Sequence, residues 1–200
     1  KFTNSLHLRL LLRVSNRSEM DAYQRLSHIL NNPEVYPIFN SLNDEAVLEV
    51  SGIPPLMSPW DRPQDFNSFR PVTEFFVDNL KHSEDPRLPH FASTAKGQDN
   101  ENYGYIGVPT DFINTPLPDS IASPSGIRQH LAVAPMIIPI LSYAEVCFIQ
   151  AELALKGHLN GSAEEHYNNG VKAAIEMWGL EMPEDYLDHP KVKFNGSLEQ

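Results

Sequence analysis

The sequence has one cysteine, few basic residues and no hydrophobic run long enough to cross a bilayer. The single Cys147 excludes an intrachain disulfide and a thiolate metal centre within these 200 residues. Arg9 and Arg13 interrupt the leucine-rich stretch near the N-terminus. Lys and Arg number 15 against 26 Asp and Glu, which gives a formal charge of -11. That balance disfavours a nucleic-acid partner, because neutralising phosphates requires clustered basic side chains.

The motifs of common enzymes and metal sites are also missing. There is no HExxH or HxH pair, no GxSxG turn around a serine nucleophile and no phosphate-binding glycine loop. One group of oxygen ligands suits calcium in composition but lacks the EF-hand spacing: Asp99, Asn100, Glu101, Asn102 and Asp111. We therefore predict no catalytic residues, no bound metal ion and no cofactor.

The clearest feature present is a helical hairpin over residues 143–179. The only charged residues of its first helix are Glu145, Glu152 and Lys156, which fall on one narrow line at 3.6 residues per turn. A helix with so thin a polar stripe is buried on most sides. Gly157 stands where a left-handed residue ends a helix.

The second helix of the hairpin starts at Ser162, and Glu165 three residues later completes a capping box. One apolar face follows, with Trp178 as its last predicted core residue before Gly179 closes the helix. Small residues mark where two backbones approach: Ala151, Ala154, Gly170, Ala173 and Ala174. The pattern predicts a tetratricopeptide-like helix pair over residues 140–180.

Residues 1–32 predict a first helical pair. The range 6–14 has a helical pattern, with Asn4 or Ser5 as its N-cap. Ser18 is the predicted cap of the second helix. Because the chain opens inside a helix without a cap or leader, we expect it to be a fragment of a longer protein.

Residues 33–139 form a long irregular segment. Thirteen of the 17 prolines lie between Pro54 and Pro139, which excludes a continuous helix. The segment is too rich in aromatic residues to be disordered. These residues are Trp60, Phe66, Phe69, Phe75, Phe76, Phe91, Tyr103, Tyr105 and Phe112.

Local patterns within this segment predict a few short elements. AVLEV at 46–50 predicts a strand, and 71–80 predicts a helix with Pro71 in its first turn. Asp85, which precedes a proline, begins either a helix or a simple turn. Beyond the hairpin, residues 181–200 form a partial extension.

Five stretches of the sequence together resemble the SusD/RagB family: KFTNSLHLRLLLRVS at 1–15, DPRL at 85–88, YGYIGVP at 103–109, PMIIPILSYAEVCFIQAELALKG at 135–157 and YNNGVKAAIEMWG at 167–179. Members of this family are longer, surface-exposed outer-membrane lipoproteins of Bacteroidetes that bind glycans. The resemblance implies a mainly α-helical, SusD-like fold with tetratricopeptide-like pairs and a long irregular, loop-rich segment.

The resemblance also implies partners and a location. The helical scaffold would pack against a SusC-like TonB-dependent transporter, and the irregular part would carry the surface for an oligosaccharide or polysaccharide. The protein would sit on the outer membrane at the cell surface, attached through an N-terminal lipid that is absent from this chain. The implied function is non-enzymatic glycan binding and delivery to the transporter.

The matched motifs contain no ligand-contacting residue, so the binding candidates come from residue chemistry. A sugar ring presents an apolar C–H face that stacks on a flat aromatic side chain, and polar groups fix its orientation. Trp60 lies in a proline-stiffened polar loop, and Tyr103 and Tyr105 flank Gly104 in a second polar stretch. We predict that these three rings bind the ligand. The alternative is that they plug or brace the scaffold.

Two other functions compete with glycan uptake. A tetratricopeptide-type protein-interaction module predicts one exposed apolar patch on the outer helix faces. A glycoside hydrolase requires two carboxylates that face each other across a cleft, and 26 acidic residues supply such pairs by chance.

Overall fold

The computed structural model describes residues 1–58, 70–111 and 114–198, and this part of the chain is mainly helical, as predicted. It forms two compact units. Unit 1 comprises Lys1–Leu48, Pro139–Asp188 and Val192–Gln200, and unit 2 comprises Glu49–Ile138 and His189–Lys191. In the described ranges, no helix is long and apolar enough to cross a membrane.

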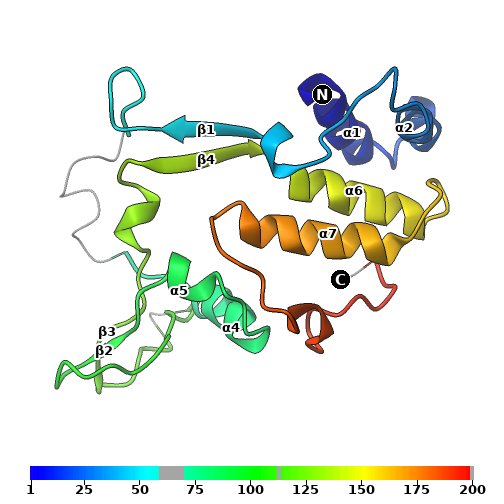
Figure 1. Cartoon of the computed structure of the whole chain (residues 1–200). Helices are drawn as coiled ribbons and strands as arrows, with labels where there is room; N and C mark the ends of the chain where they lie inside the picture. The colour runs from blue at the N-terminus through cyan, green and yellow to red at the C-terminus, as the bar shows by residue number, and fades with distance from the viewer. Residues whose placement is uncertain (59–69, 112–113, 199–200) are drawn as a thin grey trace. The chain divides into compact units, whose positions relative to one another are not determined.

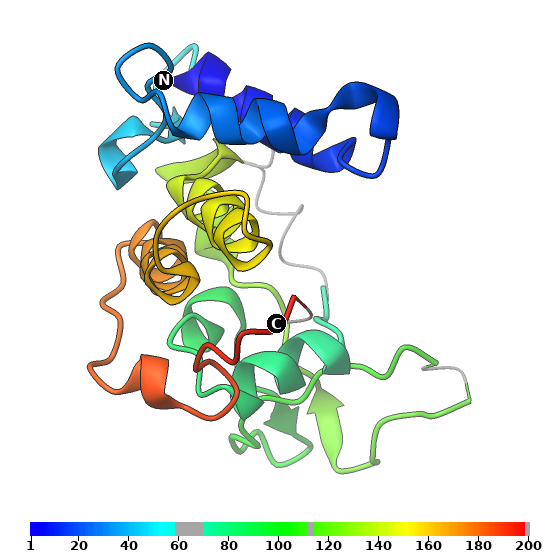
Figure 2. The ribbon, with the colours of Figure 1, turned by 90° about the vertical axis from the view of Figure 1, so that its right-hand side faces the viewer.

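The predicted hairpin is present in unit 1. Helices α6 (Tyr143–Leu155) and α7 (Ala163–Glu176) run side by side in opposite directions (Figures 1 and 2). The Oγ atoms of Ser142 and Ser162 each accept a hydrogen bond, at 3.2 Å, from the backbone N–H three residues later. Gly157 has a φ of +76°, which confirms its left-handed conformation after α6.

Small residues let α6 and α7 approach closely. A Cβ added to Gly170 of α7 would lie 2.7 Å from the ring of Phe148 on α6. Ala151 and Ala173 are buried at the same hairpin. Small residues at these positions therefore allow close packing of the two helices, and at Gly170 it is the Phe148 ring of α6 that fills the space.

The C-terminal part of unit 1 packs against the end of α7. Ile175, Tyr186 and Val192 form a buried cluster, and Tyr186 begins the short turn η4 (Tyr186–Asp188). Trp178 was predicted as a core residue, but it is only partly buried. Because α7 ends before it and a turn follows, the ring does not continue the buried face of the helix.

The N-terminal helical pair is present with different boundaries. Helix α1 (Phe2–Arg13) begins before residue 4, so the prediction of Asn4 or Ser5 as N-cap is wrong. Ser5 is fully buried, and its Oγ accepts a hydrogen bond from the backbone N–H of Phe39 at 2.9 Å. The hydroxyl therefore serves a neighbouring segment instead of a helix end.

Helix α2 (Ala22–Leu30) does not start at Ser18, so that prediction is also wrong. Ser18 opens the 3-10 turn η1 (Ser18–Met20), which has no side-chain cap. Asp21 follows with a φ of +47°. A left-handed residue interrupts the hydrogen bonding of a right-handed helix, so α2 begins after it.

An apolar core joins α1, α2 and α6. Its buried members are Leu8, Leu11, Leu26, Ile29, Phe39, Leu141, Val146, Ile149 and Leu153. Two polar contacts lie at its edge. The Arg9 guanidinium forms an ion pair with Glu145. Lys156 Nζ donates to the Tyr23 hydroxyl at 2.9 Å. The α6 region is thereby linked to both N-terminal helices.

Two strands carry the chain between the units. Strand β1 (Ala46–Val50) follows the turn η2 (Leu42–Asp44), has the predicted bounds and pairs with β4 (Met136–Leu141). The two arrows point in opposite directions in Figure 1. The chain leaves unit 1 within β1 and returns to it within β4.

Unit 2 contains short elements around a small core. Helices α4 (Glu74–His82) and α5 (Leu88–Phe91) precede an antiparallel pair formed by β2 (Lys96–Gly97) and β3 (Ile121–Ser123), and the turn η3 (Gln129–Leu131) comes next. The buried core residues are Val72, Val77, Leu88 and Ala92.

Helix α4 starts later than predicted, so Pro71 is not in its first turn. The backbone N–H of Val72 donates to the Ser125 carbonyl at 2.9 Å, which keeps this stretch extended. Thr73 caps the helix, because its Oγ1 accepts from the N–H of Phe76 at 3.3 Å.

Asp85 forms a turn, the second of the two alternatives. Its carboxylate accepts a hydrogen bond from the backbone N–H of Arg87 at 2.8 Å and also pairs with the Arg87 guanidinium. The ion pair compensates the burial of the carboxylate.

Ser5→Ala should lower the free energy of unfolding by about 1–3 kcal/mol, because the buried N–H of Phe39 would lose its acceptor. Urea denaturation of the full-length protein measures the change. Ser18→Ala is the matched control, since Ser18 is exposed and caps no helix. Its effect should stay below about 0.5 kcal/mol. Equal losses in the two variants would contradict the role of Ser5.

Gly107→Ala should also destabilise the protein, by roughly 1–3 kcal/mol. A Cβ at Gly107 would lie 2.4 Å from the carbonyl oxygen of Thr73, and backbone cannot move aside as a side-chain tip can. Gly126→Ala is the milder comparison, because its Cβ would lie 3.1 Å from the Arg70 carbonyl oxygen. Thermal unfolding ranks the two variants, and the reverse order would refute the close approach at Gly107.

Candidate functional site

Tyr103 and Tyr105 belong to a hairpin-like loop of unit 2. The backbone N–H of Ala95 donates to the Gly104 carbonyl at 2.7 Å, and the N–H of Tyr103 donates to the Ala95 carbonyl at 3.1 Å. Near the tip, Asn100 has a φ of +64°, a conformation in which asparagine is enriched. Backbone hydrogen bonds therefore fix the loop, although it contains little regular strand.

Tyr103 is the more exposed of the two rings, with 43% of the residue accessible to solvent. Part of the ring rests against Gly97, where an added Cβ would lie 2.3 Å from Cε2 of Tyr103. Because Gly97 has no side chain, the Tyr103 ring packs directly against the backbone of the loop. The remaining ring surface is open to a ligand.

Tyr105 has a different environment. Its ring is partly buried and packs against the core cluster that contains Val72, Val77 and Leu88. Its backbone carbonyl also accepts a hydrogen bond from Lys81 Nζ at 3.5 Å. These contacts brace the loop on the unit and leave less of the ring for a ligand. The third predicted ring, Trp60, lies outside the described residues.

An apolar hollow in unit 2 brings together aromatic residues that were not singled out as ligand-binding. It has a volume of about 460 Å³ and is lined by Pro71, Val72, Thr73, Phe76, Phe91, Ile127 and Leu131. The ring centroids of Phe76 and Phe91 lie 6.2 Å apart. Phe75, the neighbour of Phe76 on α4, is 75% exposed. Successive side chains of a helix point about 100° apart, so two consecutive phenylalanines indicate that one of the rings points away from the core.

Two histidines are sequence neighbours of residues that line this hollow. His90 precedes Phe91 and His130 precedes Leu131, and the two imidazole centroids are 4.6 Å apart. Burial lowers the pKa of both rings, and the positive charge of Arg128 lowers each pKa further. Both rings are therefore neutral at pH 7, the form in which an imidazole has one donor and one acceptor.

Carboxylates do not converge in this part of the chain. Within the described residues, no three His, Cys, Asp or Glu side chains form a group that could hold a metal ion. The acidic and amide residues considered as calcium ligands instead accept hydrogen bonds within their own turns. Asp99 Oδ1 accepts from the N–H of Glu101 at 3.0 Å, and Asn102 Oδ1 accepts from the N–H of Gly104 at 2.8 Å. Asp111 accepts from the Asn114 amide at 2.9 Å.

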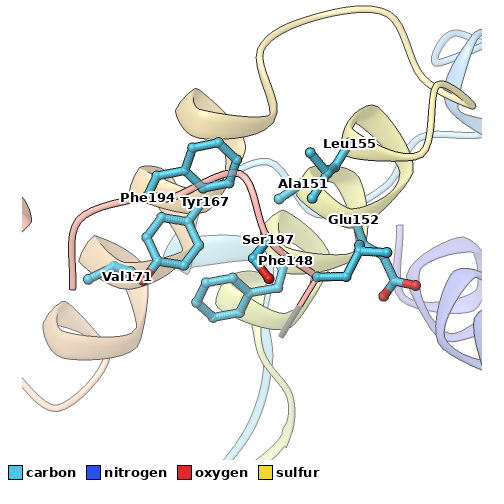
Figure 3. Close-up of a pocket in the computed structure, with 9 residues that line it drawn as sticks. Phe148, Ala151, Glu152, Leu155, Tyr167, Val171, Phe194 and Ser197 are labelled. Atoms are coloured by element: carbon cyan, nitrogen blue, oxygen red, sulfur yellow. The ribbon is translucent and has the colours of Figure 1, made fainter. Parts of the chain in front are cut away.

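Unit 1 has a second hollow, of about 390 Å³, where the C-terminal segment passes α6 and α7. Figure 3 shows the rings of Phe148, Tyr167 and Phe194 around it. The Tyr167 centroid lies 5.9 Å from that of Phe148 and 5.5 Å from that of Phe194. Glu152 is the one acidic residue among the described lining residues, and its carboxylate is paired with Lys156.

A family model matches residues 1–200 of the chain. It represents SusD-like proteins and is described as starch-binding and associating with the outer membrane. No curated protein matches the chain.

Solved structures share the fold. A SusD homologue from Bacteroides fragilis has a TM-score of 0.78 at 20% sequence identity, covering 100% of this chain and 48% of that one. A chitin-binding protein has a TM-score of 0.70 at 24% identity, with coverages of 94% and 43%. For a SusD homologue from Bacteroides vulgatus the TM-score is 0.66 at 26% identity, with coverages of 94% and 37%.

This chain therefore spans less than half the length of these three structures. The family model covers every residue of the chain, and the resemblance carried by its five sequence stretches is confirmed. The chain belongs to the SusD-like family of starch-binding proteins that associate with the outer membrane.

Proposed function

We propose that this chain is part of a non-enzymatic protein that binds oligosaccharide or polysaccharide at the bacterial cell surface. The observation that carries the proposal is the exposed ring of Tyr103, seated on a hydrogen-bonded loop in a chain of a starch-binding family. Unit 2 would provide the ligand surface and the helices of unit 1 the scaffold.

The chemistry of unit 2 suits a sugar. Tyr103 offers a flat ring for the C–H face of a pyranose, and the exposed ring of Phe75 offers another within the same unit. A ring held by a rigid loop loses little conformational entropy on binding. Trp60 would add a third ring from the neighbouring proline-rich stretch, as its sequence context predicts.

Electrostatics favour an uncharged glycan. A formal charge of -11 produces a negative field that repels sulfated or uronate-rich polymers. Neutral glycans such as starch-type glucans are not repelled by this field. Because sugars give up good hydration when they bind, the affinity of each site should be weak.

The proposal of binding without hydrolysis is supported by the lining of the apolar hollow in unit 2. A glycosidase needs two carboxyl groups about 5–10 Å apart. None of the described residues that line the apolar hollow of unit 2 is acidic. Asp85, the buried carboxylate of that unit, is paired with Arg87.

Delivery to a SusC-like TonB-dependent transporter completes the proposal. The outer-membrane association of the family and the helical scaffold of unit 1 support it. In the full-length protein, an N-terminal lipid would hold the molecule at the membrane and so keep the bound glycan near the transporter.

A protein-interaction module is the second candidate, and the hollow in Figure 3 favours it. Phe148 is 37% exposed and Leu198 is 59% exposed beside that hollow. Apolar side chains that gather exposed around one hollow are typical of a surface that contacts another protein.

Tyr103→Ala should weaken glycan binding about five- to thirtyfold, because the stacking ring is lost. Calorimetric titration of the full-length protein with a panel of neutral oligosaccharides measures this, with Trp60→Ala as the second test variant. Phe2→Ala is the control, since Phe2 is an exposed ring of unit 1 and should not affect affinity. If the wild-type protein binds no member of a broad panel, glycan binding is ruled out as its function.

Chromogenic glycosides incubated with the full-length protein should release no chromophore above the uncatalysed background. The reason is the lack of an acidic pair in the described part of the unit 2 hollow. Turnover that disappears when a single carboxylate is replaced would instead establish a glycoside hydrolase.

A further inference from the structure

A third hollow lies in unit 1, on a side of the hairpin that the proposed function does not use. It has a volume of about 300 Å³ and is bounded by the end of α2, the segment 33–40, α6 and the first half of α7. Ligand pockets span about 300–1,000 Å³, so this hollow suits a small ligand. Its lining is mixed, with aromatic, amide and imidazole side chains.

Helical spacing explains why polar groups converge there. Tyr143, Cys147 and Gln150 are four and three residues apart on α6, so they share one face of the helix. His166 and Asn169 are three residues apart on α7 and share the opposing face. The closely packed hairpin therefore directs both sets of side chains into one space.

Three polar side chains of these two faces are available to a ligand. The side chains of Gln150, His166 and Asn169 make no hydrogen bond with any described residue. Burial lowers the pKa of His166, so its ring is neutral at pH 7. Two amides and a neutral imidazole together offer both donors and acceptors.

The aromatic groups are also uncharged. Burial, with a hydrogen bond to Cys147, raises the pKa of Tyr143 to about 12, so the phenol stays protonated. The ring of Tyr36 is held edge-on against His28, with centroids 5.5 Å apart.

Among the described residues that line the hollow, none is Asp, Glu, Lys or Arg. The nearby Lys1 ammonium donates to the lining residue Asn40 at 3.4 Å, but its charge is paired with Asp44 at 2.7 Å. A charged ligand would therefore find no free counter-ion among the described residues, whereas an uncharged one would need none.

From this arrangement we propose that the hollow is a binding site for a single uncharged sugar ring. Vicinal hydroxyls of the ring pair with the amides of Gln150 and Asn169 and with the imidazole of His166. Its C–H face packs on Tyr36 or Tyr143. The small volume selects one ring over an extended chain. This site is separate from the Tyr103 surface and lies in the other unit, so either site can exist without the other.

The probes are D-glucose, N-acetyl-D-glucosamine and D-glucuronate, added to the full-length protein and followed by saturation-transfer NMR. At least one of the two uncharged sugars should show transfer in the millimolar range, and the His166 resonances should shift with it. Glucuronate, which has a similar ring but a carboxylate, should bind at least fivefold more weakly.

Asn169→Leu removes the amide at nearly constant volume and should weaken sugar binding about five- to tenfold. Asn168→Leu is the matched control, because Asn168 is the preceding residue of α7 and does not line the hollow. It should change the affinity less than twofold. Gln150→Met is the second test variant, and circular dichroism confirms that all three remain folded.

The proposal is overturned if no uncharged sugar binds, if glucuronate binds equally well, or if the two asparagine variants behave alike. It is also overturned if a capped dipeptide amide binds more tightly than either sugar, which would indicate a peptide site. Tyr103→Ala separates the two sites, since it should leave monosaccharide binding unchanged. Loss of that binding in Tyr103→Ala but not in Asn169→Leu would refute this site and leave the Tyr103 surface intact.

Discussion

The burial of helix α6 on almost every side is the constraint on which unit 1 depends. Val146, Ile149 and Leu153 belong to one cluster with leucines of α1 and α2, and Gly170 of α7 admits Phe148 on another side. Truncating one such large side chain typically costs about 2–5 kcal/mol. A whole domain is stable by only about 5–15 kcal/mol, so the pair of N-terminal helices and the hairpin stabilise each other through α6.

Unit 2 is organised differently, because its apolar core is small. Its segments are joined by backbone hydrogen bonds and by a few buried polar side chains. Ser125 exchanges hydrogen bonds with Ile106: its N–H donates to the Ile106 carbonyl at 2.7 Å, and its Oγ accepts from the Ile106 N–H at 2.9 Å. Such contacts hold irregular backbone in one conformation. They let the unit keep aromatic rings such as Tyr103 on its surface without relying on a larger core.

The three hollows differ in chemistry because each collects side chains from a different set of faces. Helix α6 shows this within three residues: Phe148 lines the ring-lined hollow of Figure 3, Ile149 enters the core, and Gln150 lines the amide-lined hollow. Steps of about 100° per residue produce this separation. A single buried helix thus supplies a scaffold and two distinct surfaces.

The sequence by itself determined the features that depend on neighbouring residues. The hairpin, the cap at Ser162, the left-handed Gly157 and the strand at 46–50 all follow from spacing and local chemistry. The family also follows, since its motifs are spread along the chain. The caps predicted at Asn4 or Ser5 and at Ser18 were wrong. The first helix already begins at Phe2, and the Ser5 hydroxyl instead accepts from the distant N–H of Phe39. The left-handed Asp21 delays the second helix.

Only the tertiary structure decided which rings are exposed and which polar groups share a cavity. Tyr103 and Tyr105 are two residues apart in similar sequence, yet one rests on a glycine and the other packs on the core. Gln150 and Asn169 meet only because α6 and α7 pack closely. Exposure and convergence depend on partners far away in the chain, and local patterns contain no information about those partners.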